Sequence, residues 1–96
     1  MLIWVIYDIS SNKIRNKVVR KCKNVGLYRV QKSVFLGDIE DNVLDELKIH
    51  FEDMVNLDTD SVYVFPMSRG ELNKAGLIGQ AFDKELVTDD IISKFF

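Results

Sequence analysis

An apolar run close to the start of the chain, LIWVIYDI at residues 2–9, is interrupted by a single charged residue, Asp8. Isoleucine, valine and aromatic side chains fill both its odd and its even positions, so a strand formed here has little polar surface on either face. Such a strand has to be covered on both faces. We therefore expect it at the centre of a sheet, with Asp8 at its carboxyl end.

Two helical patterns alternate with further strands along the rest of the chain. Polar residues 10–12 offer N-caps for the first helix, which Gly26 can close in the left-handed conformation. The expected elements are a helix over residues 12–25, a strand over 28–36 that bends or splits in two, a helix from 38 to about 55, a strand over 60–65 and a candidate short strand over 77–82. Pro66 lacks a backbone donor, which places the end of the strand over 60–65 at an edge of the sheet or at its exit from the sheet.

Strands interleaved with two helices in 96 residues predict an α+β fold, the ferredoxin-like two-layer sandwich of βαββαβ type. Its antiparallel sheet carries both helices on one face. We interpret residues 1–96 as a single domain, because a chain of this length supports only one core. No apolar run reaches the roughly 18 residues that a membrane span requires, and no signal peptide is evident, so we expect a cytoplasmic protein without a membrane partner.

The C-terminal segment, residues 76–96, contains two apolar stretches, LIGQAF and IISKFF, after a nearly complete sandwich. Their backbone N–H and C=O groups need hydrogen-bond partners. Pairing with the sheet of a second subunit supplies them, and this predicts a homodimer that exchanges its C-terminal strand. The alternative is a frayed tail or a strand packed on its own chain.

Charge divides the chain into two parts. Residues 1–37 contain eight lysine and arginine residues and one acidic residue, which gives a net charge of +7. Residues 38–96 contain five lysine and arginine residues and fourteen acidic residues, which gives a net charge of −9. At about 100° per residue, one side of the first helix collects Lys13, Lys17, Arg20 and Lys21, the basic stripe, opposite its apolar positions. The stripe predicts binding to an anionic partner such as a nucleic acid.

Arg15 lies outside the basic stripe and borders the buried side of its helix, so its guanidinium needs a partner. Asp8 is the nearest candidate, and an ion pair between the two is one interpretation. The other is a metal or catalytic role for Asp8, because ligands commonly bind at the carboxyl ends of central strands. One carboxylate is too few for a hydrolytic magnesium site, but a homodimer supplies two. We interpret Cys22 and His50, the only cysteine and histidine, as structural.

Three stretches together resemble a known family: YDIS at residues 7–10, RVQKSVF at 29–35 and, after one helix, DSVYVFPM at 60–67. Their order and intervals are similar to those of the small CRISPR-associated protein 2 family of spacer acquisition. The resemblance implies a ferredoxin-like homodimer that sits between dimers of the CRISPR integrase and holds double-stranded prespacer DNA. Several members of that family are described as magnesium-dependent endonucleases on RNA or double-stranded DNA.

Carried onto this chain, the family's metal-binding aspartate falls on Asp8, and two copies of Asp8 would hold one Mg²⁺ or another divalent cation. Its catalytic arginines fall on Arg15 and Arg29, which would steady phosphate charge, and its second-strand phenylalanine falls on Phe35, a supporting residue. Lys17 stands where arginine is common in the family, which suits a phosphate contact that needs only a point charge. The similarity is weaker after residue 67.

These expectations leave more than one function open. A duplex-binding scaffold needs the basic stripe and an acidic half that docks the integrase, whereas a metal-dependent endonuclease needs Asp8. A stand-alone, toxin-like endoribonuclease of the same fold is the alternative, acting on single-stranded RNA. A small-molecule regulatory domain would leave the basic stripe unexplained. We favour the scaffold, because one acid per chain and no evident general base make a poor dedicated nuclease.

Overall fold

The computed structural model describes residues 1–83 and 94 of the chain. Its elements follow the expected order, and one further helix comes after the last strand. They are β1 (Leu2–Asp8), α1 (Asn12–Asn24), β2 (Tyr28–Gln31), β3 (Val34–Asp38), α2 (Asp41–Met54), β4 (Ser61–Met67) and α3 (Arg69–Lys74). None of the helices in the described part of the chain has the length and apolar character needed to cross a membrane.

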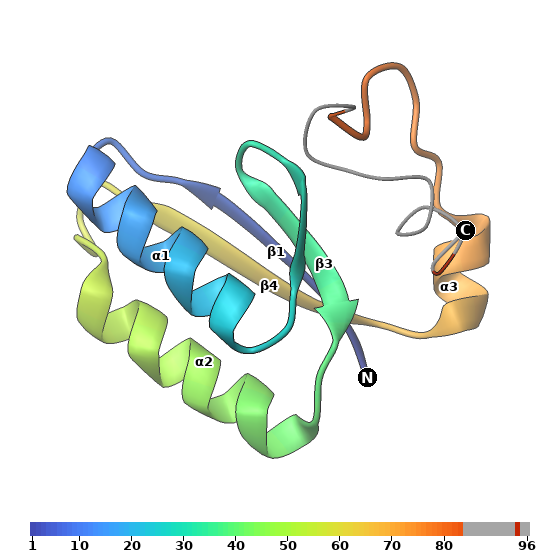
Figure 1. Ribbon diagram of the computed structural model, residues 1–96, viewed down its shortest axis with the longest axis horizontal. Helices are drawn as coiled ribbons and strands as arrows, with labels where there is room; N and C mark the ends of the chain where they lie inside the picture. Colours follow the sequence, from blue (N-terminus) through green and yellow to red (C-terminus); the bar gives the residue numbers. More distant parts are fainter. Residues whose placement is uncertain (84–93, 95–96) are drawn as a thin grey trace.

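The four strands form one antiparallel sheet in the order β2-β3-β1-β4. Helices α1 and α2 lie side by side on one face of the sheet, and α3 lies apart from them (Figure 1). The predicted ferredoxin-like sandwich is confirmed, as are the split of residues 28–36 into two strands and the edge position of β4. The exchange of a strand between subunits stays a prediction.

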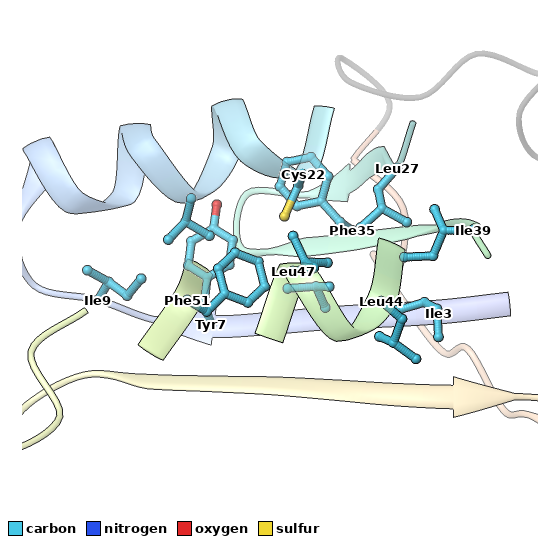
Figure 2. Close-up of a cluster of buried hydrophobic side chains, with 12 residues drawn as sticks. Ile3, Tyr7, Ile9, Cys22, Leu27, Phe35, Ile39, Leu44, Leu47 and Phe51 are labelled. Atoms are coloured by element: carbon cyan, nitrogen blue, oxygen red, sulfur yellow. The ribbon is translucent and has the colours of Figure 1, made fainter. Parts of the chain in front are cut away.

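The main core lies between the sheet and the two long helices (Figure 2). Strand β1 contributes Ile3, Val5 and Tyr7, and α2 contributes Leu47 and Phe51, all of them buried. Removing an aliphatic or aromatic side chain of this size from water is worth about 1.5–3 kcal/mol. The helices are therefore held on the sheet mainly by the residues of one face of β1 and the strands beside it.

The opposite face of the sheet, which we call the open face, is covered at one end only. There Leu2 and Trp4 of β1 are buried together with Leu36 of β3 and Leu72 of α3. Toward the carboxyl end of β1 the cover stops, so Ile6 is 37% exposed. The doubly covered strand expected from the sequence is thus confirmed for most of β1, and its uncovered end is where Asp8 lies.

Two glycines and one serine shape the connections around α1. Ser11 caps the helix, because its hydroxyl accepts a hydrogen bond from the backbone N–H of Ile14 over 3.3 Å. After the helix, Gly26 has a φ of 95°, a conformation that favours glycine. Gly37 of β3 has a different constraint: a Cβ at this position would lie 2.8 Å from the Leu27 side chain and 3.0 Å from its Cα. The α1–β2 connection therefore packs directly on the backbone of β3.

The short helix α3 was not expected from the sequence. Ser68 accepts a hydrogen bond from the N–H of Glu71 over 3.1 Å, and the Glu71 carboxylate accepts one from the N–H of Ser68 over 3.0 Å. This reciprocal capping box is a local signal that the residues SRGE carry. The helix then places Leu72 against the covered end of the open face.

The expected short strand at residues 77–82 is wrong for this single chain, because these residues form no regular secondary structure. Gly79 has a φ of 75°, which takes the backbone out of the extended conformation. The segment instead passes the edge of β2, where the N–H of Asp83 donates to the carbonyl of Val30 over 2.8 Å. Most of the C-terminal segment defined above lies outside the described residues, so its pairing with a second subunit stays a prediction.

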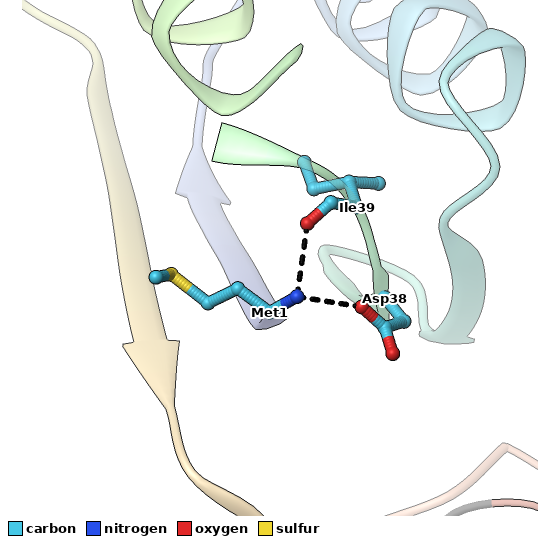
Figure 3. Close-up of polar contacts among 3 residues, drawn as sticks. All are labelled: Met1, Asp38 and Ile39. Atoms are coloured by element: carbon cyan, nitrogen blue, oxygen red, sulfur yellow. Dashed lines mark hydrogen bonds and ion pairs between the residues drawn. The ribbon is translucent and has the colours of Figure 1, made fainter. Parts of the chain in front are cut away.

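The start of β1 is tied to the end of β3. The amino group of Met1 lies 2.7 Å from Oδ1 of Asp38 and donates a second hydrogen bond to the carbonyl of Ile39 over 3.1 Å (Figure 3). The hydrogen bond from this amino group lowers the pKa of Asp38 below its usual value. Because both partners are exposed, the ion pair orders the end of the sheet more than it stabilises the fold.

Phe35 generates a direct test of the core, because it has no exposed surface and its ring centroid lies 6.4 Å from that of Tyr7. Phe35→Ala should lower the free energy of unfolding by about 3–5 kcal/mol, since it leaves a cavity between the sheet and the helices. Urea denaturation followed by circular dichroism measures the loss. The control is Ile49→Ala, at a position 59% exposed, which should change the free energy by less than about 0.5 kcal/mol. Similar losses in both variants would contradict this description of the core.

Candidate nucleic-acid interface

Helix α1 presents a line of cations to solvent. Lys13, Lys17 and Arg20 are exposed, and Lys21 is partly buried. Residues three and four apart are neighbours on a helix surface, so the exposed charges form one continuous stripe. The solvent-facing arrangement expected from helical spacing is therefore observed, with Lys21 at its margin.

Arg15 does not contact Asp8. Its Nη1 donates to the backbone carbonyl of Ile9 over 2.8 Å and to that of Ser10 over 3.5 Å. Within residues 1–83 and 94, Asp8 takes part in no ion pair. The reason is the alternation of side chains along β1, which directs Asp8 to the open face while Arg15 and α1 lie on the other side of the sheet. The ion-pair interpretation of Asp8 is wrong.

A hollow of about 310 Å³ lies between α1 and the turn that joins β2 to β3, and we call it the basic hollow. It is lined by Tyr7, Arg15, Asn16, Val19, Arg29, Lys32 and Ser33. Three of these residues are cationic and none is acidic. Two of the candidate site residues, Arg15 and Arg29, therefore meet in one place. Lys32 and Tyr7 were missed from the sequence, because only the folding of the β2–β3 hairpin against α1 brings them to the arginines.

Two side chains hold the β2–β3 turn in place by donating hydrogen bonds to one of its backbone carbonyls, that of Lys32. Arg29 donates from Nε and Nη2 to the carbonyl of Lys32 over 3.0 and 2.7 Å, and the hydroxyl of Tyr7 donates to the same oxygen over 2.8 Å. Burial raises the pKa of Tyr7 in spite of the opposing charge of Arg29, so the hydroxyl stays protonated at neutral pH. This protonated hydroxyl and the guanidinium together fix the turn beside the basic hollow.

Both arginines of the basic hollow keep donors that face no counter-charge. A guanidinium has five N–H donors, and two nitrogens of Arg29 and one of Arg15 donate to backbone carbonyls. Neither arginine has a carboxylate partner in the described part of the chain. Because both side chains are partly buried, an anion that reaches them gains charge-assisted hydrogen bonds. The planar guanidinium fork matches the geometry of a phosphate group.

Asp8 stands beside apolar surface. On the uncovered end of the open face, Ile6, Tyr63 and Phe65 are 37%, 54% and 45% exposed. The rings of Tyr63 and Phe65 stack with their centroids 6.0 Å apart, and Ile6 lies opposite Tyr63 in the strand register. We call these three residues the apolar patch. Asp8 and the basic hollow thus lie on different faces of the sheet.

A divalent cation needs more ligands than Asp8 of one chain. Mg²⁺ is octahedral and takes oxygen ligands, commonly one or two protein carboxylates with waters and substrate phosphates. No three His, Cys, Asp or Glu side chains among the described residues gather so that they could hold a metal ion. The exposed carboxylate of Asp8 therefore supplies one candidate oxygen-ligand group and not a complete site within one chain.

The other reactive side chains do not join this interface. Cys22 is buried in the main core, and burial raises the pKa of its thiol to about 12, so the reactive thiolate is absent at neutral pH. His50 is exposed on α2 and does not line the basic hollow. Ser33 does line it, but no histidine, aspartate or glutamate is present there to act as a general base.

The sequence model of the family described as CRISPR associated protein Cas2 matches residues 1–75 of the chain. This range contains every helix and strand from β1 to α3, together with Asp8, Arg15 and Arg29. The chain is also similar to a protein of Pyrobaculum aerophilum described as CRISPR-associated endoribonuclease Cas2 2. The two are 33% identical over 79 residues, which are 82% of this chain and 87% of the relative.

Two solved structures share the fold. Cas2 from Streptococcus pyogenes superimposes with a TM-score of 0.71 at 23% identity, over 82% of this chain and 100% of that one. The hypothetical protein TT1823 from Thermus thermophilus superimposes with a TM-score of 0.65 at 30% identity, over 70% of this chain and 80% of that one. The match over the whole of the first structure supports the two-layer arrangement described above.

The contacts of Arg29 predict a structural cost for its replacement. Arg29→Met should lower the free energy of unfolding by about 1–3 kcal/mol, because the carbonyl of Lys32 loses two charge-assisted donors. The control Lys17→Met removes an exposed cation and should change the free energy by less than about 0.5 kcal/mol. Urea unfolding measures both variants. A fully stable Arg29→Met protein would mean that the turn does not depend on this guanidinium.

Proposed function

The chain belongs to the CRISPR associated protein Cas2 family, and from this premise we propose that it acts in spacer acquisition as a homodimeric adaptor. The dimer would bind double-stranded prespacer DNA and bridge the CRISPR integrase in the cytoplasm. The observation that carries this proposal is the basic surface around α1, where the basic stripe and the basic hollow share one helix.

Both parts of this surface suit a phosphate backbone. The exposed cations Lys13, Lys17 and Arg20 attract phosphates without regard to base sequence, since their contacts are electrostatic. Arg15 and Arg29 present partly buried donors that suit one phosphate held in a fixed place. Binding of this kind is independent of sequence, as an adaptor for DNA of arbitrary sequence requires.

The apolar patch supports the homodimer. Exposed apolar surface next to polar residues commonly marks an interface between proteins. Packing two copies face to face about a twofold axis would cover Ile6, Tyr63 and Phe65 of each. Because Asp8 borders the patch, the same packing would bring the two Asp8 carboxylates toward each other.

A metal-dependent endonuclease activity on RNA or double-stranded DNA is a second proposal, supported by the name endoribonuclease given to relatives and by the exposed carboxylate of Asp8. Two Asp8 side chains would hold the divalent cation, which supplies polarisation of a phosphoryl oxygen and a lower pKa for a bound water. Arg15 and Arg29 lie on the other face of the sheet, so they would bind a phosphate of the same nucleic acid away from the cation rather than the phosphate that is cleaved. Adaptor binding does not require Asp8, which lies on the other face of the sheet, and for this reason we place the adaptor role first.

Charge reversal tests the adaptor. Lys17→Glu combined with Arg20→Glu should weaken binding of every duplex sequence alike by tenfold or more at low salt, and should reduce the slope of log affinity against log salt by roughly two. Fluorescence anisotropy with two unrelated labelled duplexes measures both quantities. The matched control, Lys48→Glu with Lys74→Glu, makes the same change of net charge outside the basic stripe and should bind nearly as wild type. Sequence-selective binding, or equal losses in both double variants, would contradict backbone recognition by α1.

Asp8→Asn tests the endonuclease. We expect wild type, incubated with Mg²⁺ and labelled duplex DNA or single-stranded RNA, to cleave at least one substrate, and Asp8→Asn to lose more than about 90% of that activity while its dimer mass and duplex binding persist. Glu46→Gln, which neutralises an exposed carboxylate of α2, should cleave as wild type. Equal binding without cleavage by either protein would leave an adaptor alone. Cleavage of RNA without duplex binding would instead favour the stand-alone endoribonuclease.

A further inference from the structure

A second hollow, of about 500 Å³, lies between the end of α2, the connection that follows it and β4. We call it the α2–β4 groove. Val55, Leu57 and Val62 are among its apolar lining residues, and Glu52 and Asp60 are among its polar ones. None of these five residues belongs to the basic stripe, the basic hollow or the apolar patch. Tyr63 of the apolar patch also lines the groove, so the groove adjoins the surface proposed for dimerisation but shares no residue with the basic stripe or the basic hollow.

The floor of the groove is apolar. Val55 and Val62 are partly buried and pack against the main core, while Leu57 beside them is 73% exposed. A single exposed leucine is ordinary, but here it stands at a concave surface with aliphatic neighbours. An aliphatic side chain of another molecule would bury Leu57 and extend the valine surface, and this burial is a source of affinity.

The surroundings of the groove are anionic. Residues 40–60 contain eight aspartate and glutamate residues and one lysine. That residue, Lys48, also lines the groove, and its Nζ lies 3.6 Å from Oδ1 of Asp45 in an exposed ion pair. Glu52 is exposed at the groove, and the Asp60 carboxylate accepts a hydrogen bond from the N–H of Asn56 over 3.0 Å, which holds the connection in shape. The groove thus has a fixed wall and a negative rim.

We propose that the α2–β4 groove docks a cationic segment of a protein partner. One aliphatic side chain of the segment packs on Leu57, and flanking lysine or arginine side chains face Glu52 and Asp60. The apolar contact supplies most of the affinity. The charges increase the association rate and orient the segment in the groove. This surface is opposite in sign to the one proposed for DNA, so the two partners do not compete for it.

Charge also separates this partner from two other occupants. A nucleic acid is a polyanion and is repelled by the acidic rim. Residues 83–96 of the chain contain four acids and two lysines, so the C-terminal segment of a second copy would meet like charge in the groove. A cationic segment with an aliphatic anchor is the occupant whose two properties both match.

The test is a titration of the full chain, labelled with ¹⁵N, with the peptide acetyl-Lys-Lys-Leu-Lys-Lys-amide at low and at physiological salt. Chemical shifts should change at residues 52–62, and binding should weaken as salt rises. Leu57→Ser should weaken binding roughly tenfold, whereas Ile49→Ser, at an exposed aliphatic position of α2 outside the groove, should not. Glu52→Lys should weaken binding and flatten its salt dependence, and Glu46→Lys, on the same helix but outside the groove, should do neither.

Several results would overturn the proposal. The apolar contact would be contradicted if a peptide with serine in place of leucine bound as tightly as the original peptide, or if the Leu57→Ser protein bound the original peptide as tightly as wild type. The charge contribution would be contradicted if a peptide with glutamate in place of every lysine and the same leucine bound to the protein. The site would be contradicted if the chemical shifts changed only at another surface, or if no binding was seen at millimolar peptide. Shifts of groove residues on dilution of the protein alone would identify a second copy as the occupant instead. Duplex binding should be the same in wild type and Leu57→Ser, so a failure here is distinguishable from a failure of the adaptor.

Discussion

The architecture depends on β1, a strand that pairs on both sides and is packed on both faces. Among the described strands it is the only neighbour of β4, and it joins β4 to the β2–β3 hairpin. Its residues alternate between the core under the helices and the smaller core of the open face. The same alternation sends Tyr7 to the basic hollow and Asp8 to the apolar patch. One short run of sequence thus determines the two cores and separates the candidate binding site from the candidate metal ligand.

The two long helices give the helical layer an electrical asymmetry. Helix α1 has six lysine and arginine residues and no acid, whereas α2 has five acids and one lysine. They lie next to each other in Figure 1, so a polyanion near the surface feels attraction from one helix and repulsion from the other within a Debye length of about 8–10 Å. A duplex bound as proposed would therefore be displaced toward α1 and away from the acidic helix. The groove proposed for a cationic partner lies at the end of that acidic helix.

The sequence carries most of the fold and less of the candidate site. Strongly periodic segments such as the one that forms α1 were located to within a few residues, and Pro66 placed β4 at an edge of the sheet. Helix α3 was not predicted, because its sequence signal is one local capping box rather than a helical repeat of apolar residues. The partner expected for Arg15 was wrong, because α1 packs on the face of the sheet opposite to the one that carries Asp8, and this choice of face is set by tertiary packing. The basic hollow could not be predicted, because it exists only where a hairpin and a helix meet.

The alternation along β1 gives single-residue insertions and deletions a different meaning from substitutions. A substitution at Tyr7 or Asp8 changes one side chain on one face. An inserted or deleted residue earlier in the strand would invert the facing of every position after it, placing the carboxylate against the hydrophobic core and the tyrosine in water. Both candidate sites would then be lost together although all of their residues were still present. The number of residues in β1 before Tyr7 and Asp8 therefore matters to both candidate sites as much as the identity of the residues themselves.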